Sequence, residues 1–195
     1  MQLLTSRVRR VAAMVAASAA VAIPAGAQAQ ATQSGGAAFT PAVGQPAPDF
    51  TATATDSTGR AIPVSLAQYH GKVVVLAFYP ADRSSGCTIE LSKFRDDYAT
   101  LFGQGTVVLP ASVDSLASHA SWAKDAHFPF AMIADTAGAI AKQYSSAAPG
   151  RRFFRRTTFV IGRDGKVAYA DPRFNPNSQE SYDKLEAAIK AANAQ

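Results

Sequence analysis

The residue with the clearest capacity for chemistry is Cys87, the only cysteine among the 195 residues. It follows a loop that begins at Pro80 and contains Ser84, and it stands at the start of a segment with helical spacing of apolar side chains. A thiol becomes a strong nucleophile when it ionises, and the free amides and positive dipole end of a helix N-terminus favour the thiolate. We therefore expect Cys87 to be a reactive thiol rather than an inert buried side chain.

Two elements must hold Cys87 in this position. The apolar, β-branched run Val73–Phe78 predicts a strand that is buried on both faces. After the loop, apolar positions at helical spacing predict an amphipathic helix: Ile89, Leu91, Phe94 and Tyr98. Ser84 or Ser85 is the expected N-cap, whose hydroxyl would accept a hydrogen bond from a free amide of the first turn. Gly103–Gly105 is expected to end this helix.

The remaining chain alternates strand and helix patterns. Strands are expected at 51–55, 62–64, 106–109, 128–133, 157–161 and 166–169, and helices at 116–126, 137–144 and 178–193. Turn residues at 57–60 and 162–165 predict two hairpins, and 112–115 should supply an N-cap to the second helix. This order predicts an α/β protein with the thioredoxin-like fold, in which helices flank a central mixed sheet that is preceded by an N-terminal hairpin.

The first thirty residues have the pattern of an export signal. Three arginines precede a short apolar run at 11–23, and small residues follow with Ala-x-Ala patterns that end at Ala27, Ala29 or Ala31. We expect a signal peptide at 1–30, a flexible tether at 31–43 and one domain at 44–195, in a protein exported to the periplasm. Both the Sec and the twin-arginine routes remain open.

Charge gives no sign of a nucleic-acid partner. Three of the 19 basic residues would leave with the signal, so that about 16 remain against 14 acidic residues. A domain so close to neutral lacks the basic footprint of a nucleic-acid-binding protein. No membrane contact is expected after cleavage either.

The loop around Cys87 resembles a known active site. Pro80-x3-Ser84-x2-Cys87 is similar to the Pro-x3-Thr/Ser-x2-Cys motif of the peroxiredoxins of the AhpC/TSA superfamily, and Ser84–Thr88 is most similar to the Thr-Pro-Gly-Cys-Thr loop of the bacterioferritin-comigratory-protein (PrxQ) subfamily. Downstream, 156–166 matches the family pattern Arg-x-x-Phe-Val-Ile-x-x-Asp-Gly-Lys. The resemblance implies a thiol-dependent peroxidase that needs no cofactor and reduces hydrogen peroxide and organic hydroperoxides.

The resemblance also implies a role for each residue of the site. Cys87 would attack the peroxide and become a sulfenic acid. Arg156 would lie beside the sulfur, where its guanidinium can stabilise the thiolate and hold peroxide oxygens. Ser84 would position the peroxide, Pro80 would shield the thiol from water, and Glu90 could orient Arg156.

Each of these assignments has a structural alternative. Arg156 belongs to a basic cluster that could simply be a solvated loop, in which Arg155 is the competing candidate for the catalytic arginine. Ser84 could serve only as an N-cap, and Glu90 could be an ordinary carboxylate on the helix surface. The histidines show no metal-ligand spacing and are expected to be structural or exposed: His70, His119 and His127. Trp122 is expected in the core.

The chain departs from many PrxQ relatives at the resolving cysteine, whose position five residues after Cys87 holds Ser92. The resemblance therefore implies a one-cysteine mechanism, in which an external thiol attacks the sulfenic acid. Glutathione, a thioredoxin-like protein and a glutaredoxin all remain open as reductants, as do a monomer and a dimer.

Two other functions remain open at this point. An exported thioredoxin-like thiol–disulfide oxidoreductase is disfavoured because Ser84 takes the place of the first cysteine of a Cys-x-x-Cys motif. A non-enzymatic peroxide-sensing module would carry the same fold without turnover.

Overall fold

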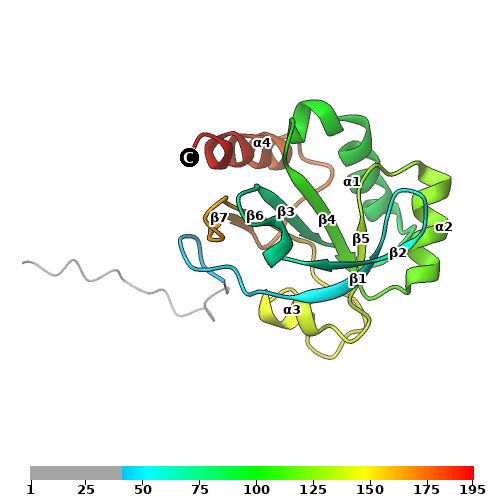
Figure 1. Ribbon diagram of the computed structural model, residues 1–195. Helices are drawn as coiled ribbons and strands as arrows, with labels where there is room; N and C mark the ends of the chain where they lie inside the picture. Colours follow the sequence, from blue (N-terminus) through cyan, green and yellow to red (C-terminus); the bar gives the residue numbers. More distant parts are fainter. Residues whose placement is uncertain (1–40) are drawn as a thin grey trace, which may run out of the picture. The chain divides into compact units, whose positions relative to one another are not determined.

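A mixed sheet forms the centre of the computed structural model, which describes residues 41–195. The predicted signal peptide at 1–30 and residues 31–40 of the predicted tether lie outside the described residues. Seven strands follow the order β2-β1-β5-β4-β3-β6-β7 (Figure 1). Their bounds are β1 Thr51–Thr55, β2 Ala61–Ser65, β3 Val74–Phe78, β4 Val107–Ser112, β5 Met132–Ala134, β6 Thr157–Ile161 and β7 Val167–Asp171.

Strand β3 is central in this order and determines the topology around it. It pairs in parallel with β4 and antiparallel with β6, and β4 pairs in parallel with β5. β1 joins β5 antiparallel and forms the edge hairpin with β2, while β6 and β7 form a second hairpin. The predicted mixed sheet with an N-terminal hairpin is therefore confirmed.

Helices cover both faces of the sheet. Their bounds are α1 Ser85–Asp96, α2 Leu116–Ala126, α3 Ala139–Gln143 and α4 Gln179–Asn193, with a 3₁₀ turn at Ala67–Tyr69 and a π-helical turn at Tyr98–Phe102. Figure 1 shows α1, α2 and α4 on one face of the sheet and α3 on the other. Within residues 41–195, no helix has the length and apolar character needed to cross a membrane.

The alternation of side chains along β3 creates two separate cores. Val75 and Ala77 face the core that contains Cys87, Trp122 and the inner sides of α1 and α4. The intervening residues face the second core on the α3 side: Val74, Leu76 and Phe78. Every residue of β3 is buried, as the apolar run predicts. Trp122, with 3% of its surface exposed, lies in the core as expected.

The predicted end of α1 at Gly103–Gly105 is wrong, because the regular helix ends at Asp96. A π-helical turn follows and places Phe102 against Phe94, with ring centroids 5.2 Å apart. The wider turn lets Phe102 reach the core. Gly103, at φ +66°, then ends the turn in a left-handed conformation that favours glycine.

The predicted helix at 137–144 is shorter in the structure because Gly138 adopts φ +66° and begins α3 one residue later. The Asp135 carboxylate accepts hydrogen bonds from the amides of Ala139 and Ala141, at 2.8 Å each. It thereby satisfies amides that a helix start leaves without helical acceptors.

We expect Ser115→Ala to lower the free energy of unfolding by about 1 kcal/mol, because the Ser115 hydroxyl accepts a hydrogen bond from the Ser118 amide at the start of α2. Ser178→Ala is the matched control, since Ser178 caps α4 without a side-chain hydrogen bond. Urea denaturation of both variants measures the difference. Equal losses of stability would contradict this account of the α2 cap.

Candidate active site

Cys87 is the third residue of α1 and lies fully buried at the end of β3. The first backbone hydrogen bond of the helix runs from the Thr88 amide to the Ser84 carbonyl, at 2.8 Å. The amides of Ser85, Gly86 and Cys87 therefore precede the regular helical pattern and have no helical acceptor. Their N–H groups and the helix dipole favour negative charge at the Cys87 sulfur.

Ser84 is the N-cap residue of α1, as the sequence predicts, but its side chain does not cap the helix. The Ser84 hydroxyl instead donates to the Ala81 carbonyl, at 3.1 Å, so the predicted side-chain cap is wrong. The Ser84 hydroxyl points into the β3–α1 loop, where the Ala81 carbonyl accepts its hydrogen bond, and not toward the amides of α1. Pro80 lies half-buried in the same loop.

Arg156 joins the cysteine to a buried carboxylate. Its Nη2 donates to Cys87 Sγ at 3.4 Å, and its Nη1 donates to Glu90 Oε2. The Glu90 side chain is completely buried and that of Arg156 is 16% exposed. The structure thus brings Arg156, which is distant in sequence, to two residues of α1, Cys87 and Glu90, whereas Arg155 lies exposed.

The register of β6 determines where Arg156 lies. Thr157 pairs with Phe78, the last residue of β3, and this places Arg156 just beyond that end of the strand. Cys87 follows the same end of β3 through the loop. Antiparallel pairing of β3 and β6 therefore brings the guanidinium and the sulfur to one edge of the sheet.

The charges of the site depend on one another. Burial raises the pKa of Glu90 to about 7, and the neighbouring Arg156 guanidinium opposes this rise. For Arg156, burial lowers the pKa but the charges of Glu90 and Cys87 outweigh it, so the net shift is upward. Glu90 Oε1 is buried without a hydrogen-bond partner in the described part of the chain. Arg156 is thus the main group that compensates the Glu90 charge.

Gly86 leaves space for the guanidinium. A Cβ at this position would lie 3.1 Å from Arg156 Nη2 and 4.0 Å from Pro176, in the segment before α4. A side chain at this position would therefore force the Arg156 guanidinium to move by at least a few tenths of an ångström.

A buried polar network next to the site was not predicted. Asp82, in the β3–α1 loop, accepts hydrogen bonds from Tyr79 Oη at 2.7 Å and Ser118 Oγ at 2.6 Å, and its carboxylate lies 2.9 Å from His119 Nδ1. Burial opposes ionisation of Asp82, but the hydrogen bonds of His119 and Ser118 outweigh it and lower the pKa of the carboxyl. The network attaches the loop to α2.

The histidines fit the sequence-based expectation of structural or exposed roles. His119 is buried within the network, whereas His70 and His127 are exposed. In the sequence, the only indication of this network was the adjacent polar pair Ser118 and His119 on an amphipathic helix. Their partner Asp82 could be identified only from the three-dimensional structure. Within residues 41–195, no group of three or more His, Cys, Asp and Glu side chains could hold a metal ion.

Comparison with known proteins identifies the family. The model of the AhpC/TSA family matches residues 43–170, and the chain belongs to this family. It is 36% identical over 156 residues to peroxiredoxin Q of Arabidopsis thaliana, covering 76% of this chain and 67% of that protein.

Solved structures agree with this assignment. The peroxidoxin BcpB from Mycobacterium tuberculosis superimposes with a TM-score of 0.65 at 31% identity, covering 76% of this chain and 96% of that one. Enterococcus faecalis AhpC superimposes with a TM-score of 0.69 at 27% identity, covering 77% of this chain and 94% of that one. The thioredoxin-like fold predicted from the sequence is confirmed.

We expect Gly86→Ala to slow alkylation of Cys87 by iodoacetamide about three- to tenfold, because the new methyl group displaces the Arg156 guanidinium from the sulfur. Ser85→Ala, on the exposed neighbouring position, is the control and should react like the wild type. Unchanged alkylation of the Gly86→Ala protein would show that Arg156 does not activate the thiol.

We expect Glu90→Gln to remove a pH dependence of stability. The pKa of Glu90 is raised from 4.5 to about 7 in the folded protein, so the fold retains a proton that the unfolded chain loses. The wild type should therefore lose stability relative to Glu90→Gln as the pH rises from 5 to 8, by up to about 3 kcal/mol.

Urea denaturation at both pH values measures this difference. Glu180→Gln, at a glutamate whose side chain is 73% exposed, is the control and should show no comparable change. A wild type that gains stability over Glu90→Gln across this range would contradict the upward shift of the Glu90 pKa.

Proposed function

We propose that the protein is a thiol-dependent peroxidase in which Cys87 reduces hydrogen peroxide and organic hydroperoxides. The observation that carries this proposal is the contact of the buried Cys87 Sγ with Arg156 Nη2 at the start of a helix. Membership of the AhpC/TSA family supports the same activity. A thiol–disulfide exchange activity lacks such support, because no second cysteine is present.

The first step would be attack of the Cys87 thiolate on one peroxide oxygen. A bond forms between sulfur and that oxygen, the O–O bond breaks, and the second oxygen leaves as hydroxide or alkoxide and takes up a proton. The sulfur becomes a sulfenic acid. The Arg156 guanidinium and the free amides at the start of α1 are suitably placed to stabilise negative charge that moves from sulfur to oxygen.

The remaining site residues would act on substrate geometry. Glu90 would orient Arg156 through their ion pair. Ser84, whose hydroxyl bonds to the Ala81 carbonyl, could turn to donate to a bound peroxide, and Pro80 would limit the access of water to the sulfur. We propose these two roles from the resemblance of the loop to the family motif.

Recovery of the thiol would need an external reductant. A first thiol attacks the sulfenic sulfur, releases water and forms a mixed disulfide, and a second thiol then releases Cys87 and leaves as a disulfide. Ser92 stands where many PrxQ relatives carry their resolving cysteine, so this chain cannot supply the attacking thiol. Its sulfenic acid would stay open to a second peroxide and to over-oxidation.

We further propose that the protein works in the periplasm after removal of its first 27 to 31 residues. The basic, apolar and small-residue order of the N-terminal segment supports this. The mass and N-terminal sequence of protein recovered from an osmotic-shock fraction would test it, and a full-length cytoplasmic protein would refute it.

The test of the proposed activity is peroxide consumption by purified protein with dithiothreitol as the reductant. Cys87→Ser should abolish it. Arg156→Lys should lower kcat/KM for hydrogen peroxide about a hundredfold, because a lysine cannot contact the sulfur and the peroxide with the same planar fork. Arg155→Lys is the matched control at the exposed neighbouring position and should retain wild-type kinetics.

Peroxide consumption that survives in the Cys87→Ser protein would refute the proposal. Rapid formation of one sulfenic acid without turnover in any reductant would instead indicate a peroxide-sensing module. Equal losses in Arg155→Lys and Arg156→Lys would exclude a specific role for Arg156.

A further inference from the structure

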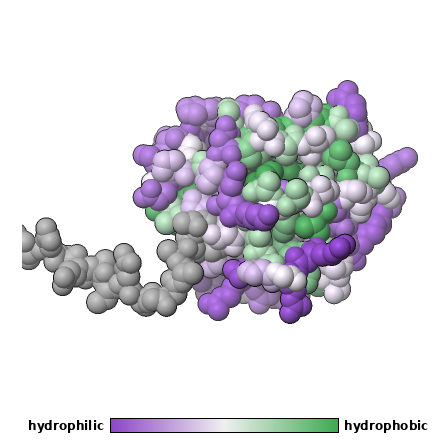
Figure 2. Space-filling view, turned by 90° about the horizontal axis from the view of Figure 1, so that it is seen from below, coloured by the Kyte–Doolittle hydropathy of each residue, from purple (hydrophilic) through white to green (hydrophobic). Residues whose placement is uncertain are grey.

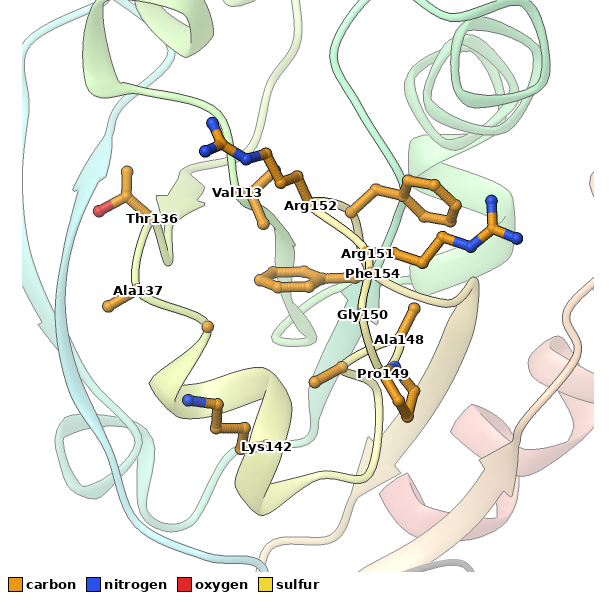
Figure 3. A pocket seen from close by; sticks show the side chains of 13 residues that line it. Val113, Thr136, Ala137, Lys142, Ala148, Pro149, Gly150, Arg151, Arg152 and Phe154 are labelled. Atoms are coloured by element: carbon orange, nitrogen blue, oxygen red, sulfur yellow. The ribbon is translucent and has the colours of Figure 1, made fainter.

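A cleft of about 590 Å³ lies between α3 and the loop that precedes β6 (Figure 3). Figure 3 shows Phe154 at its centre, with Lys142 of α3 on one side and Arg152 of the loop on another. Phe154 is only 3% exposed and forms an apolar floor together with Pro149 and other small apolar residues. The cleft thus combines an apolar floor with a basic rim.

The basic side chains of this rim form no ion pairs with other described residues, although the Asp135 carboxylate interacts electrostatically with Lys142 over a longer distance. Within residues 41–195, neither Lys142, Arg151 nor Arg152 forms an ion pair with a carboxylate. The nearby Asp135 carboxylate is occupied by two amides of α3. Arg151 lies over the ring of Phe153, 5.6 Å from its centroid. An anion that entered the cleft would therefore meet free cationic groups.

The shape of the cleft is built into the fold. The loop is closed by an isolated bridge between Ala147 and Phe154, and the buried Ser146 hydroxyl shares a hydrogen bond with Thr157 of β6. The Phe154 ring packs against Phe78 of β3, with centroids 5.9 Å apart. These contacts hold the floor and the basic loop in place without a ligand, as is usual for small-molecule sites.

The cleft lies at the edge of the sheet where Cys87 follows β3, but it opens on the α3 face, whereas Cys87 belongs to the core on the other face. A thiol held in the cleft would therefore reach the sulfur around the start of β6. Phe154 precedes Arg156 by two residues, or roughly 7 Å of extended chain, and Arg156 contacts Cys87. Hydrogen peroxide is small and uncharged, so a basic cleft of this size is not needed to bind it. The reductant, by contrast, must come from outside because the chain has no second cysteine.

We propose that this cleft binds the carboxylate groups of a small anionic thiol, the reductant of the Cys87 sulfenic acid; the inference rests on the proposed function. The basic rim would hold the carboxylates, and the apolar floor would contact the carbon skeleton. The volume is in the range of small-molecule sites, and a recessed cleft suits such a ligand better than the flat face of a protein partner.

The first test measures binding without turnover. S-methylglutathione keeps both carboxylates of glutathione but has no free thiol, and NMR titration of the full chain gives its Kd. Lys142→Gln and Arg152→Gln should each weaken binding about three- to fivefold, the effect of losing one exposed charge pair. Arg163→Gln, in the turn after the far end of β6, removes the same charge and should have no effect.

This first test is independent of the peroxidase proposal, because it needs no chemistry at Cys87. Binding that is absent, or equal in all four proteins, would overturn the cleft proposal even if the enzyme is active. Binding that follows the prediction would support the cleft even if peroxide turnover failed.

The second test measures the reduction of the sulfenic acid by two thiols, 3-mercaptopropionate and the uncharged 2-mercaptoethanol. In Lys142→Gln and Arg152→Gln, the ratio of the two rate constants should shift about three- to fivefold against the carboxylated thiol. The ratio within one protein cancels any general loss of reactivity. If this ratio is unchanged in the two variants, the proposal is overturned. If turnover with a thioredoxin-type protein falls in them instead, the cleft is a protein-docking surface.

Discussion

The organisation of the candidate site depends on one half-buried guanidinium, that of Arg156, which contacts both a sulfur and a carboxylate. Glu90 is completely buried and has one oxygen without a partner in the described chain, so its charge is tolerable only beside Arg156. Arg156 in turn reaches Cys87 at 3.4 Å. Because each member of this group lowers the cost of burying another, helix α1 and strand β6 must keep one relative position. In the proposed mechanism, the same contacts would also activate the thiol.

The surrounding structure holds these groups in register. Strand β3 pairs with β4 on one side and with β6 on the other. The loop that carries Cys87 begins at the end of β3, and the pairing with β6 places Arg156 beside the same end. The loop itself is attached to α2 by the buried contact between Asp82 and His119. A buried polar network destabilises the fold when some of its groups lack hydrogen-bond partners, and it is rigid when all of them are paired. The network around Asp82 therefore restricts the conformation of the loop. Gly86 suits this arrangement because a Cβ at this position would crowd the guanidinium, at 3.1 Å from Arg156 Nη2.

The two reactants of a one-cysteine peroxidase place different demands on the protein. A peroxide needs only a small, polar space at a buried sulfur, whereas the thiol that restores the sulfur is larger and must be recruited from solution. Our proposals assign a separate feature to each demand: the enclosed group around Cys87 to the peroxide, and the open basic cleft beside α3 to the thiol. Both lie at the ends of the same central strands, where loops converge and where open α/β sheets commonly bind their ligands.

The sequence by itself determined the elements and the position of the cysteine at the start of a helix. The complete burial of β3, the N-cap of α2 and the loop before Cys87 are encoded by neighbouring residues, so local patterns were enough to predict them. Local patterns failed where long-range packing intervened, at the π-helical turn that brings Phe102 to Phe94 and at the Ser84 hydroxyl. Only the tertiary structure decided that Arg156 rather than Arg155 contacts the sulfur, that Glu90 is buried, and that Asp82 meets His119. Those contacts join residues that are distant in the chain, and strand register and side-chain packing, which no local pattern specifies, bring them together.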